Sequence, residues 1–267
     1  MKTVTVMALI LSAFLKPVFA KDNVTLHAAI SGNHRSVEHK ARDIYRHPQQ
    51  TLEFFEVKPN MTVVEIWPGG AGWYTEILAP YLSQQGKLYA AHFAADSDVP
   101  YYQKNLQKFI DKTSANPEIY SRMELTELNP PNKVAIAPPG TADRVLTFRN
   151  VHNWIKHGNA QEVFNAMFKA LKPGGILGVV EHRIVAKKEG GKLTPGYVSQ
   201  NFVIARAMKA GFKLVAKSEI NANPKDTKDY PEGVWTLPPS LRLKDQDREK
   251  YLAIGESDRM TLKFKKP

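Results

Sequence analysis

Cysteine is absent from this chain of 267 residues, and its absence excludes several kinds of site. No disulfide can form, no thiolate can act as a nucleophile, and no cysteine sulfur can bind a metal ion. The sequence also lacks internal repeats and, beyond its signal-like start, any apolar run of the roughly 20 residues that span a bilayer. One globular domain with short additions is the class that remains.

Acidic residues are outnumbered, because 26 Asp and Glu stand against 37 Lys and Arg, which leaves a formal net charge of +11. The basic residues are scattered and form no long run. This pattern favours a solvated basic surface over a site for a dedicated anionic partner. A weak association with anionic surfaces of the cell envelope stays open, and specific binding of nucleic acid is not predicted.

Residues 1–20 have the features of a secretory signal. Lys2 gives a positive start, residues 3–15 are mostly apolar, and residues 18–20 read Val-Phe-Ala before the expected cleavage point. The apolar stretch is short for a transmembrane helix, so an uncleaved anchor is the less favoured alternative. A twin-arginine pair is absent, which favours export of the unfolded chain. We therefore expect a periplasmic or otherwise exported protein.

After the signal, short apolar runs alternate with amphipathic segments, which is the pattern of a doubly wound α/β sheet. Residues 21–55 are expected to form an N-terminal helical segment, and residues 56–267 an α/β domain with a long loop over residues 221–240. The expected strands are 62–66, 87–93, 120–125, 143–148, 176–180, 212–216 and 260–264. The expected helices are 49–55, 75–82, 101–111, 161–171 and 198–210, with one or two more before residue 48.

The most informative stretch is residues 63–78, which read Val-Val-Glu-Ile-Trp-Pro-Gly-Gly-Ala-Gly-Trp-Tyr-Thr-Glu-Ile-Leu. An apolar strand, a glycine-rich turn and an amphipathic helix follow one another, as in a cradle for a nucleotide or cofactor. Glycines let backbone N–H groups approach a ligand, and a helix N-terminus favours an anionic group. A P-loop would end in Gly-Lys-Ser/Thr, and a dinucleotide site would have a smaller residue at Thr75, so neither is favoured.

These residues, together with several other blocks, resemble a class I S-adenosylmethionine-dependent methyltransferase, and more narrowly a bacterial family of exported methyltransferases. The blocks are residues 46–48, 68–80, 143–154, 171–175, 180–183, 222–226 and 255–260. The resemblance implies a Rossmann-like seven-stranded sheet with the last strand antiparallel and helices on both faces. It also implies that S-adenosylmethionine lies across the carboxyl ends of the first, second and fourth strands.

The residues predicted to bind the donor are Glu65, Gly69, Gly70, Gly72, His92, Asp96, Asp143 and Arg149. The resemblance implies that Glu65 engages the amino end of the donor, with a structural cap on the glycine loop as the alternative. His92 stands where such enzymes usually carry the acid that binds the ribose hydroxyls. A neutral imidazole can make only one such bond, so either Asp96 or Asp98 replaces the acid, or donor binding is weakened or lost.

The predicted catalytic residues are Asn150, His152 and Asn153, which follow the fourth strand at the edge where α/β sheets carry their chemistry. His152 would act as a base for an oxygen or nitrogen nucleophile, and a satisfied structural hydrogen bond is the alternative. His182 and Arg183 end the fifth strand, and Arg183 would suit a substrate carboxylate or phosphate. No metal site is predicted.

The sequence therefore predicts an exported S-adenosylmethionine-dependent methyltransferase whose partners are a small-molecule donor and an unidentified acceptor. Two alternatives stay open. One is a non-catalytic binding or scaffold protein of the envelope on the same fold, which the replacement by His92 and the cytosolic origin of the donor would explain. The other is an enzyme that uses another nucleoside or an oxidoreductase cofactor.

Overall fold

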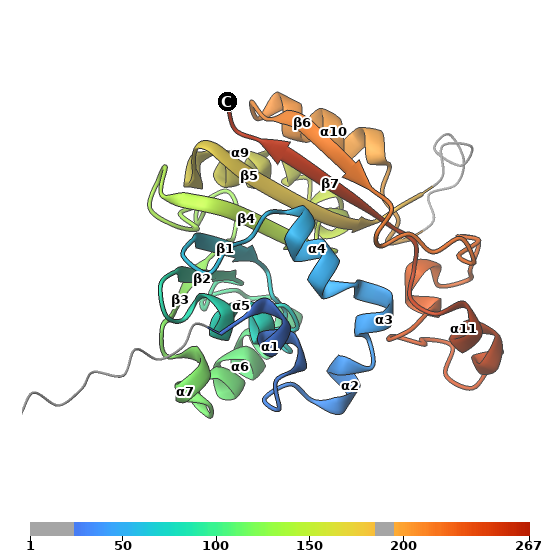
Figure 1. The fold of residues 1–267 in the computed structure, drawn as a ribbon. Helices are drawn as coiled ribbons and strands as arrows, with labels where there is room; N and C mark the ends of the chain where they lie inside the picture. Colours follow the sequence, from blue (N-terminus) through green and yellow to red (C-terminus); the bar gives the residue numbers. More distant parts are fainter. Residues whose placement is uncertain (1–23, 185–194) are drawn as a thin grey trace, which may run out of the picture.

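The structure is a computed structural model that describes residues 24–184 and 195–267. The predicted signal segment lies outside these residues. The described part forms three layers, in which one sheet lies between two sets of helices (Figure 1). Among the described helices, none is long and apolar enough to cross a membrane.

The sheet has seven strands in the order β3-β2-β1-β4-β5-β7-β6. The strands are β1 (Thr62–Ile66), β2 (Lys87–His92), β3 (Met123–Glu127), β4 (Ala142–Phe148), β5 (Leu171–His182), β6 (Lys213–Ser218) and β7 (Arg259–Lys265). The first five run parallel, whereas β7 is antiparallel to both β5 and β6. The predicted seven-stranded sheet with an antiparallel last strand is confirmed.

Helices cover both faces of the sheet (Figure 1). They are α1 (Leu26–Ser31), α2 (Val37–Lys40), α3 (Asp43–Arg46), α4 (Pro48–Phe54), α5 (Thr75–Leu82), α6 (Pro100–Ser114), α7 (Pro117–Tyr120), α8 (Val151–Lys156), α9 (Ala160–Ala170), α10 (Gln200–Lys209), the 3₁₀ helix η2 (Gly233–Thr236) and α11 (Arg248–Ile254). Leu52 and Phe55 pack with Ile77 of α5 in one apolar cluster, and Phe164 packs with Phe264 in the other. The alternation of apolar runs and amphipathic segments thus yields two cores, one on each face.

Several parts of the pattern differ from the sequence prediction, and one is β3, which covers Met123–Glu127 instead of residues 120–125. β5 begins at Leu171 instead of residue 176, because Leu171 pairs with Ala142 and the ladder resumes at Ile176 opposite Arg144. The Lys-Pro-Gly-Gly turn is therefore an irregularity inside the strand and not a loop before it. α7, α8 and α11 were also not predicted, since residues 151–156 were assigned to a polar rim and no helix was assigned to residues 117–119 or 248–254.

The parallel strands determine where a site can form. Because β1, β2, β4 and β5 run in the same direction, their carboxyl ends meet at one edge of the sheet. Residues at the beginnings of these strands lie at the opposite edge. The chemistry that the sequence places after β1 and β4 therefore converges.

Candidate functional site

A cavity of about 560 Å³ lies at this edge of the sheet. Its floor includes Glu65 from the end of β1, Phe148 from the end of β4 and His182 from the end of β5. The walls come from the segment between β1 and α5 (residues 67–74), which we call the glycine loop, from the start of α6, from α8 and from the segments around Trp235 and Glu256. A volume of this size is in the range of small-molecule and cofactor sites.

The glycine loop contributes its first glycine to the cavity, while the next two are used for packing. Gly69 lines the cavity. Gly70 donates its backbone N–H to Asn105 Oδ1 at 3.1 Å, so Asn105 occupies that donor. A Cβ at Gly72 would lie 2.9 Å from the ring of Phe109 on α6. Contact of Gly69 with a ligand therefore stays a prediction, whereas Gly70 and Gly72 hold the loop against α6.

Gly69 and Gly72 offer a matched pair of variants, because both have a positive φ, at 70° and 56°. A Cβ at Gly69 would meet nothing within 4 Å. We expect Gly72→Ala to lower the free energy of unfolding by about 2 to 4 kcal/mol, and Gly69→Ala by about 1 kcal/mol. Urea unfolding of both variants measures the difference. Equal losses would show that Phe109 does not confine the loop.

Glu65 is a buried acid on the floor of the cavity. It is 2% exposed, and its carboxylate accepts a hydrogen bond from the Thr75 hydroxyl at 2.7 Å. Burial raises the pKa of Glu65 to about 7, against the opposing effects of Thr75 and the positive charge of Lys112. Its charge therefore changes near neutral pH, which is unusual for a carboxyl group and typical of functional sites.

Three predicted donor ligands lie away from the cavity lining. His92 is fully buried, its Nδ1 accepts the Phe93 backbone N–H at 2.8 Å, and burial lowers its pKa to about 4. Asp96 is exposed and pairs with Lys133 at 2.8 Å. Asp143 begins β4, so it lies at the opposite edge of the sheet. There it accepts the Thr62 backbone N–H at 2.9 Å, which does not fit its predicted contact with a cofactor.

Aromatic side chains form the cavity wall beside the carboxyl end of β2. Phe93 and Tyr102 stack with ring centres 4.1 Å apart and an angle of 9° between the rings, and both line the cavity. Trp67 packs against Phe93 at 4.8 Å. A flat apolar ligand group would fit such a wall by stacking. Sequence reasoning missed this wall, although aromatic residues at the start of an expected helix were its signal.

The three predicted catalytic residues after β4 line the cavity, and one of them also has a structural role. Asn150, His152 and Asn153 all line it, and Asn153 is half-buried. The Asn150 side chain donates to the Ile66 backbone oxygen at 2.8 Å and to Thr147 Oγ1 at 3.3 Å. Asn150 therefore joins the ends of β1 and β4 and positions the floor.

His152 forms a dyad with a carboxylate that was not among the predicted site residues. Nδ1 of His152 lies 3.2 Å from Oε1 of Glu181, which is fully buried. The backbone N–H groups of His152 and His182 donate to the same carboxylate, at 3.3 and 2.7 Å. Because a carboxylate only accepts, the hydrogen bond places the imidazole proton on Nδ1 and leaves Nε2 as an acceptor.

His182 is the second histidine of this side of the cavity. Its ring centre lies 5.5 Å from that of His152, and its Nδ1 contacts the Ser257 hydroxyl at 2.5 Å. Burial lowers the pKa of His182 well below its usual value, and the neighbouring charges of His152 and Arg149 add to this effect. His182 is therefore neutral at physiological pH.

His152, Glu181 and His182 are also the group of described residues that could hold a metal ion, since one ligand atom from each lies within 4.8 Å of the others. Both Glu181 oxygens already accept N–H groups. Arg149 is close enough to affect the pKa of His182 and would repel a cation. The arrangement favours a base held by a carboxylate over a metal centre.

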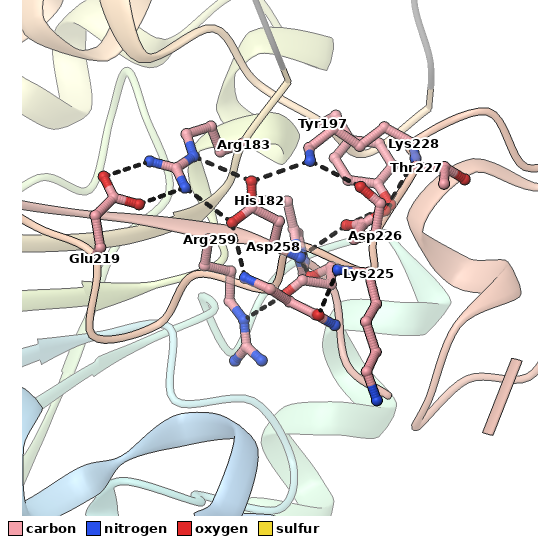
Figure 2. Close-up of polar contacts among 12 residues, drawn as sticks. His182, Arg183, Tyr197, Glu219, Lys225, Asp226, Thr227, Lys228, Asp258 and Arg259 are labelled. Carbon is pink, nitrogen blue, oxygen red and sulfur yellow. Dashed lines mark hydrogen bonds and ion pairs between the residues drawn. The ribbon is translucent and has the colours of Figure 1, made fainter. Parts of the chain in front are cut away.

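A polar network joins the end of β5, the long loop and the segment before β7 (Figure 2). The Asp226 carboxylate accepts from the Tyr197 hydroxyl at 3.0 Å and from the Asp258 backbone N–H at 2.7 Å. Asp258 in turn pairs with Arg183 at 2.9 Å and with Lys228 at 3.1 Å. The network ties the long loop to the segment before β7. Arg183 is held here and does not line the cavity, so its predicted role toward a substrate does not fit.

Solved structures that are similar to this chain include several methyltransferases. The chain is similar to a SAM-dependent methyltransferase from Aquifex aeolicus, with 18% identity, a TM-score of 0.53, and coverage of 68% of this chain and 87% of that chain. The chain has the fold of class I S-adenosylmethionine-dependent methyltransferases. A phosphoethanolamine N-methyltransferase from Haemonchus contortus, in complex with S-adenosyl-L-methionine, is similar at 13% identity and a TM-score of 0.52, over 84% of this chain and 53% of that chain.

The methyltransferase fold does not by itself determine the reaction. The cyclase SpnF is also similar, with 13% identity, a TM-score of 0.60, and coverage of 89% of this chain and 86% of that chain. No protein-family description and no curated protein matches the chain. The reaction has to be argued from the side chains of the cavity.

The residues of the cavity fit the donor that methyltransferases of this fold use. The wall of Phe93 and Tyr102 suits an adenine ring, and Gly69 allows close approach of a ligand to the backbone. The ionised carboxylate of Glu65 suits a cationic group. An acid for the ribose hydroxyls is the part of the usual donor site that the described lining residues lack after β2.

Proposed function

We propose that the protein is an S-adenosylmethionine-dependent methyltransferase that acts on a hydroxyl or amine group. The observation that carries this proposal is a single cavity that brings Glu65 and the glycine loop together with the His152–Glu181 dyad. One side has the features of a donor site, and the other has a base for the acceptor. A cavity that only bound a ligand would not need an oriented base.

Glu65, Gly69 and the wall of Phe93 and Tyr102 would hold the donor. When bound, S-adenosylmethionine supplies a methyl group that passes to the acceptor as the carbon–sulfur bond breaks and S-adenosylhomocysteine is left. Aligning the two reactants lowers the barrier without any covalent contribution from the protein. Tyr74 and Phe148, whose rings stack 3.5 Å apart at the cavity wall, help to exclude water.

His152 would accept the proton that the acceptor loses. Its Nε2 is the free nitrogen of the dyad, and Glu181 stabilises the imidazolium that forms. Because Glu181 is fully buried, the orientation of the ring is fixed before the acceptor binds. Asn153 would contact the acceptor from the same helix, and this remains a prediction.

Calorimetric titration of the purified full chain with S-adenosylmethionine and S-adenosylhomocysteine tests the proposal. We expect micromolar dissociation constants for both, as for other cofactor sites. Tyr102→Leu should weaken binding, whereas Tyr89→Leu should not, because both tyrosines pack on the same cluster and only Tyr102 lines the cavity. A folded sample that shows no binding at millimolar ligand would refute donor binding. It would favour a non-catalytic binding or scaffold protein, in which the buried His92 has replaced the acid of the donor site.

Export also belongs to this proposal. It rests on the signal-like pattern of residues 1–20 and on the basic surface, which would allow weak association with the anionic envelope. Cell fractionation with detection of the mature N-terminus tests it. Recovery of the uncleaved chain from the cytosol alone would overturn export without affecting the proposed reaction.

A further inference from the structure

Four arginine side chains gather around one carboxylate beside the cavity. Arg42 and Arg46 donate from Nε to Glu256 at 2.6 and 3.2 Å, and a terminal nitrogen of Arg259 lies 3.0 Å from it. Burial alone would raise the pKa of Glu256, but Arg46, Arg259 and Arg42 hold it far below its usual value, so Glu256 is ionised. With Arg149, four positive charges stand against one negative charge, a net charge of +3. We call these five residues the arginine group.

Several donors of the arginine group have no acceptor. Both terminal nitrogens of Arg46 and one of Arg42 are buried and make no hydrogen bond within the described residues. Arg46 is 1% exposed, and its guanidinium lies 4.6 Å from the ring centre of Trp73, which lines the cavity. Arg42, Arg46 and Arg259 do not line the cavity, so their unbalanced positive charge does not contact a ligand but favours an anion at the cavity wall beside them.

Arg149 is the member of the group that reaches the cavity with a free guanidinium. It lines the cavity, and within the described residues its side chain makes no hydrogen bond or ion pair. Its backbone has a φ of 63°, a conformation that costs energy for residues other than glycine, and its N–H donates to the Val180 oxygen at 2.7 Å. Burial lowers the pKa of Arg149 to about 10, so it stays charged at neutral pH.

Arg149 lies on the side of the cavity that carries the base, three residues before His152, whereas Arg46 lies against Trp73 of the segment between β1 and α5. Arg149 contributes to the lowered pKa of His182, whose ring is 5.5 Å from that of His152. Glu256 is followed by Ser257, which contacts His182. The stacking wall of Phe93 and Tyr102, in contrast, lies directly after β2 and at the start of α6. An anion at Arg149 would therefore belong to the molecule whose proton His152 accepts.

We propose that Arg149, with the positive charge of the other arginines behind it, binds an oxyanion, a carboxylate or phosphate, that the methyl acceptor carries near its reactive hydroxyl or amine. Arginine suits this role because its planar fork donates two parallel hydrogen bonds to such a group. The acceptor would then be a small acidic molecule, held by Arg149 while its nucleophile faces His152. This inference rests on the proposed methyl transfer.

Inorganic phosphate is the probe for the test, because the acceptor is unidentified. Its binding to the full chain is measured by calorimetry, first alone and then with the donor site saturated by S-adenosylhomocysteine, which has a carboxylate of its own. We expect phosphate to bind in both cases. Loss of phosphate binding when S-adenosylhomocysteine is present would mean that the arginine group serves the donor carboxylate, and it would overturn the inference.

Variants separate the site from the general basic charge of the protein. We expect Arg149→Gln to weaken phosphate binding by about tenfold or more. Arg149→Lys should weaken it less, since lysine keeps the positive charge but lacks the two parallel donors of a guanidinium group. Arg206→Gln is the control, because it removes the same charge from an arginine that packs over Phe202 of α10 and does not line the cavity. Thermal unfolding checks that each variant folds.

The outcomes distinguish the two proposals. Equal phosphate affinity of Arg149→Gln and the unchanged protein, or no phosphate binding at all, would overturn the anionic acceptor. If S-adenosylhomocysteine still binds in that case, the proposed methyl transfer stands. If S-adenosylhomocysteine does not bind and phosphate does, the proposed methyl transfer is refuted. The arginine group then remains an anion-binding site, but the inference that its anion belongs to a methyl acceptor is overturned with the reaction.

Discussion

Replacement of His152 by alanine is expected to lower the turnover of methyl transfer by about 10² to 10⁴, the usual contribution of a positioned acid or base. The affinity for S-adenosylhomocysteine should stay unchanged, because His152 lies on the acceptor side of the cavity. Turnover is measured as release of S-adenosylhomocysteine, with the best acceptor from a screen of hydroxyl and amine compounds. Calorimetry on the same sample gives the affinity.

His157→Ala is the matched control, since His157 also lines the cavity but contacts Tyr102 at 3.1 Å and no carboxylate among the described residues. Its turnover should fall by less than about threefold. Glu181→Gln should reduce turnover and change its pH profile, because the amide cannot stabilise an imidazolium. Similar rates for His152→Ala and His157→Ala would contradict the role of the dyad.

The same assay tests the metal alternative. A chelator such as EDTA should leave turnover unchanged if His152 is a base held by Glu181. Inactivation by EDTA that added Zn²⁺ reverses would show instead that His152, Glu181 and His182 form a metal centre. The two mechanisms use the same three residues but respond to the chelator in opposite ways.

Much of the fold could be predicted because its signals are local. β1 and α5 have the bounds that the apolar run and the helical spacing indicate, and β7 closes the sheet as expected. The Lys-Pro-Gly-Gly turn misled the prediction of β5, since turn residues inside a strand look like its beginning. Ladder pairing between Leu171 and Ala142 is not visible in the sequence of either segment alone.

The candidate site was harder to predict, because it depends on contacts between distant segments. Arg46 and Glu256 lie 210 positions apart in the chain, and no local pattern joins them. The burial of His92 against Phe109, with ring centres 4.9 Å apart, likewise depends on how α6 packs. The position of Asp143 was predictable, however, since the beginning of a parallel strand lies at the edge opposite the cavity.

The affinity for S-adenosylmethionine is expected to rise with pH up to about pH 7 and then to level off, because the donor is a cation and Glu65 must be ionised to attract it. Burial raises the pKa of Glu65 to about 7, so below that pH binding must first remove a proton. Linkage then predicts a loss of about tenfold in affinity for each pH unit below 7. Calorimetry at a series of pH values measures the slope.

Glu65→Gln should abolish this pH dependence and weaken binding about tenfold to a hundredfold at pH 8, as expected for the loss of a charge-assisted hydrogen bond.

Without ligand, ionisation of Glu65 is expected to destabilise the folded protein, whereas with the donor present it strengthens binding. Since folded Glu65 holds its proton up to about pH 7 and the unfolded chain releases it near its ordinary pKa of 4.5, ionisation in this window lowers the free energy of unfolding as pH rises. Glu65→Gln should remove that decline, which urea unfolding at pH 5 and pH 8 would reveal. A variant that keeps both pH dependences would show that another group titrates, and Glu65 would then be only a cap on the glycine loop through Thr75.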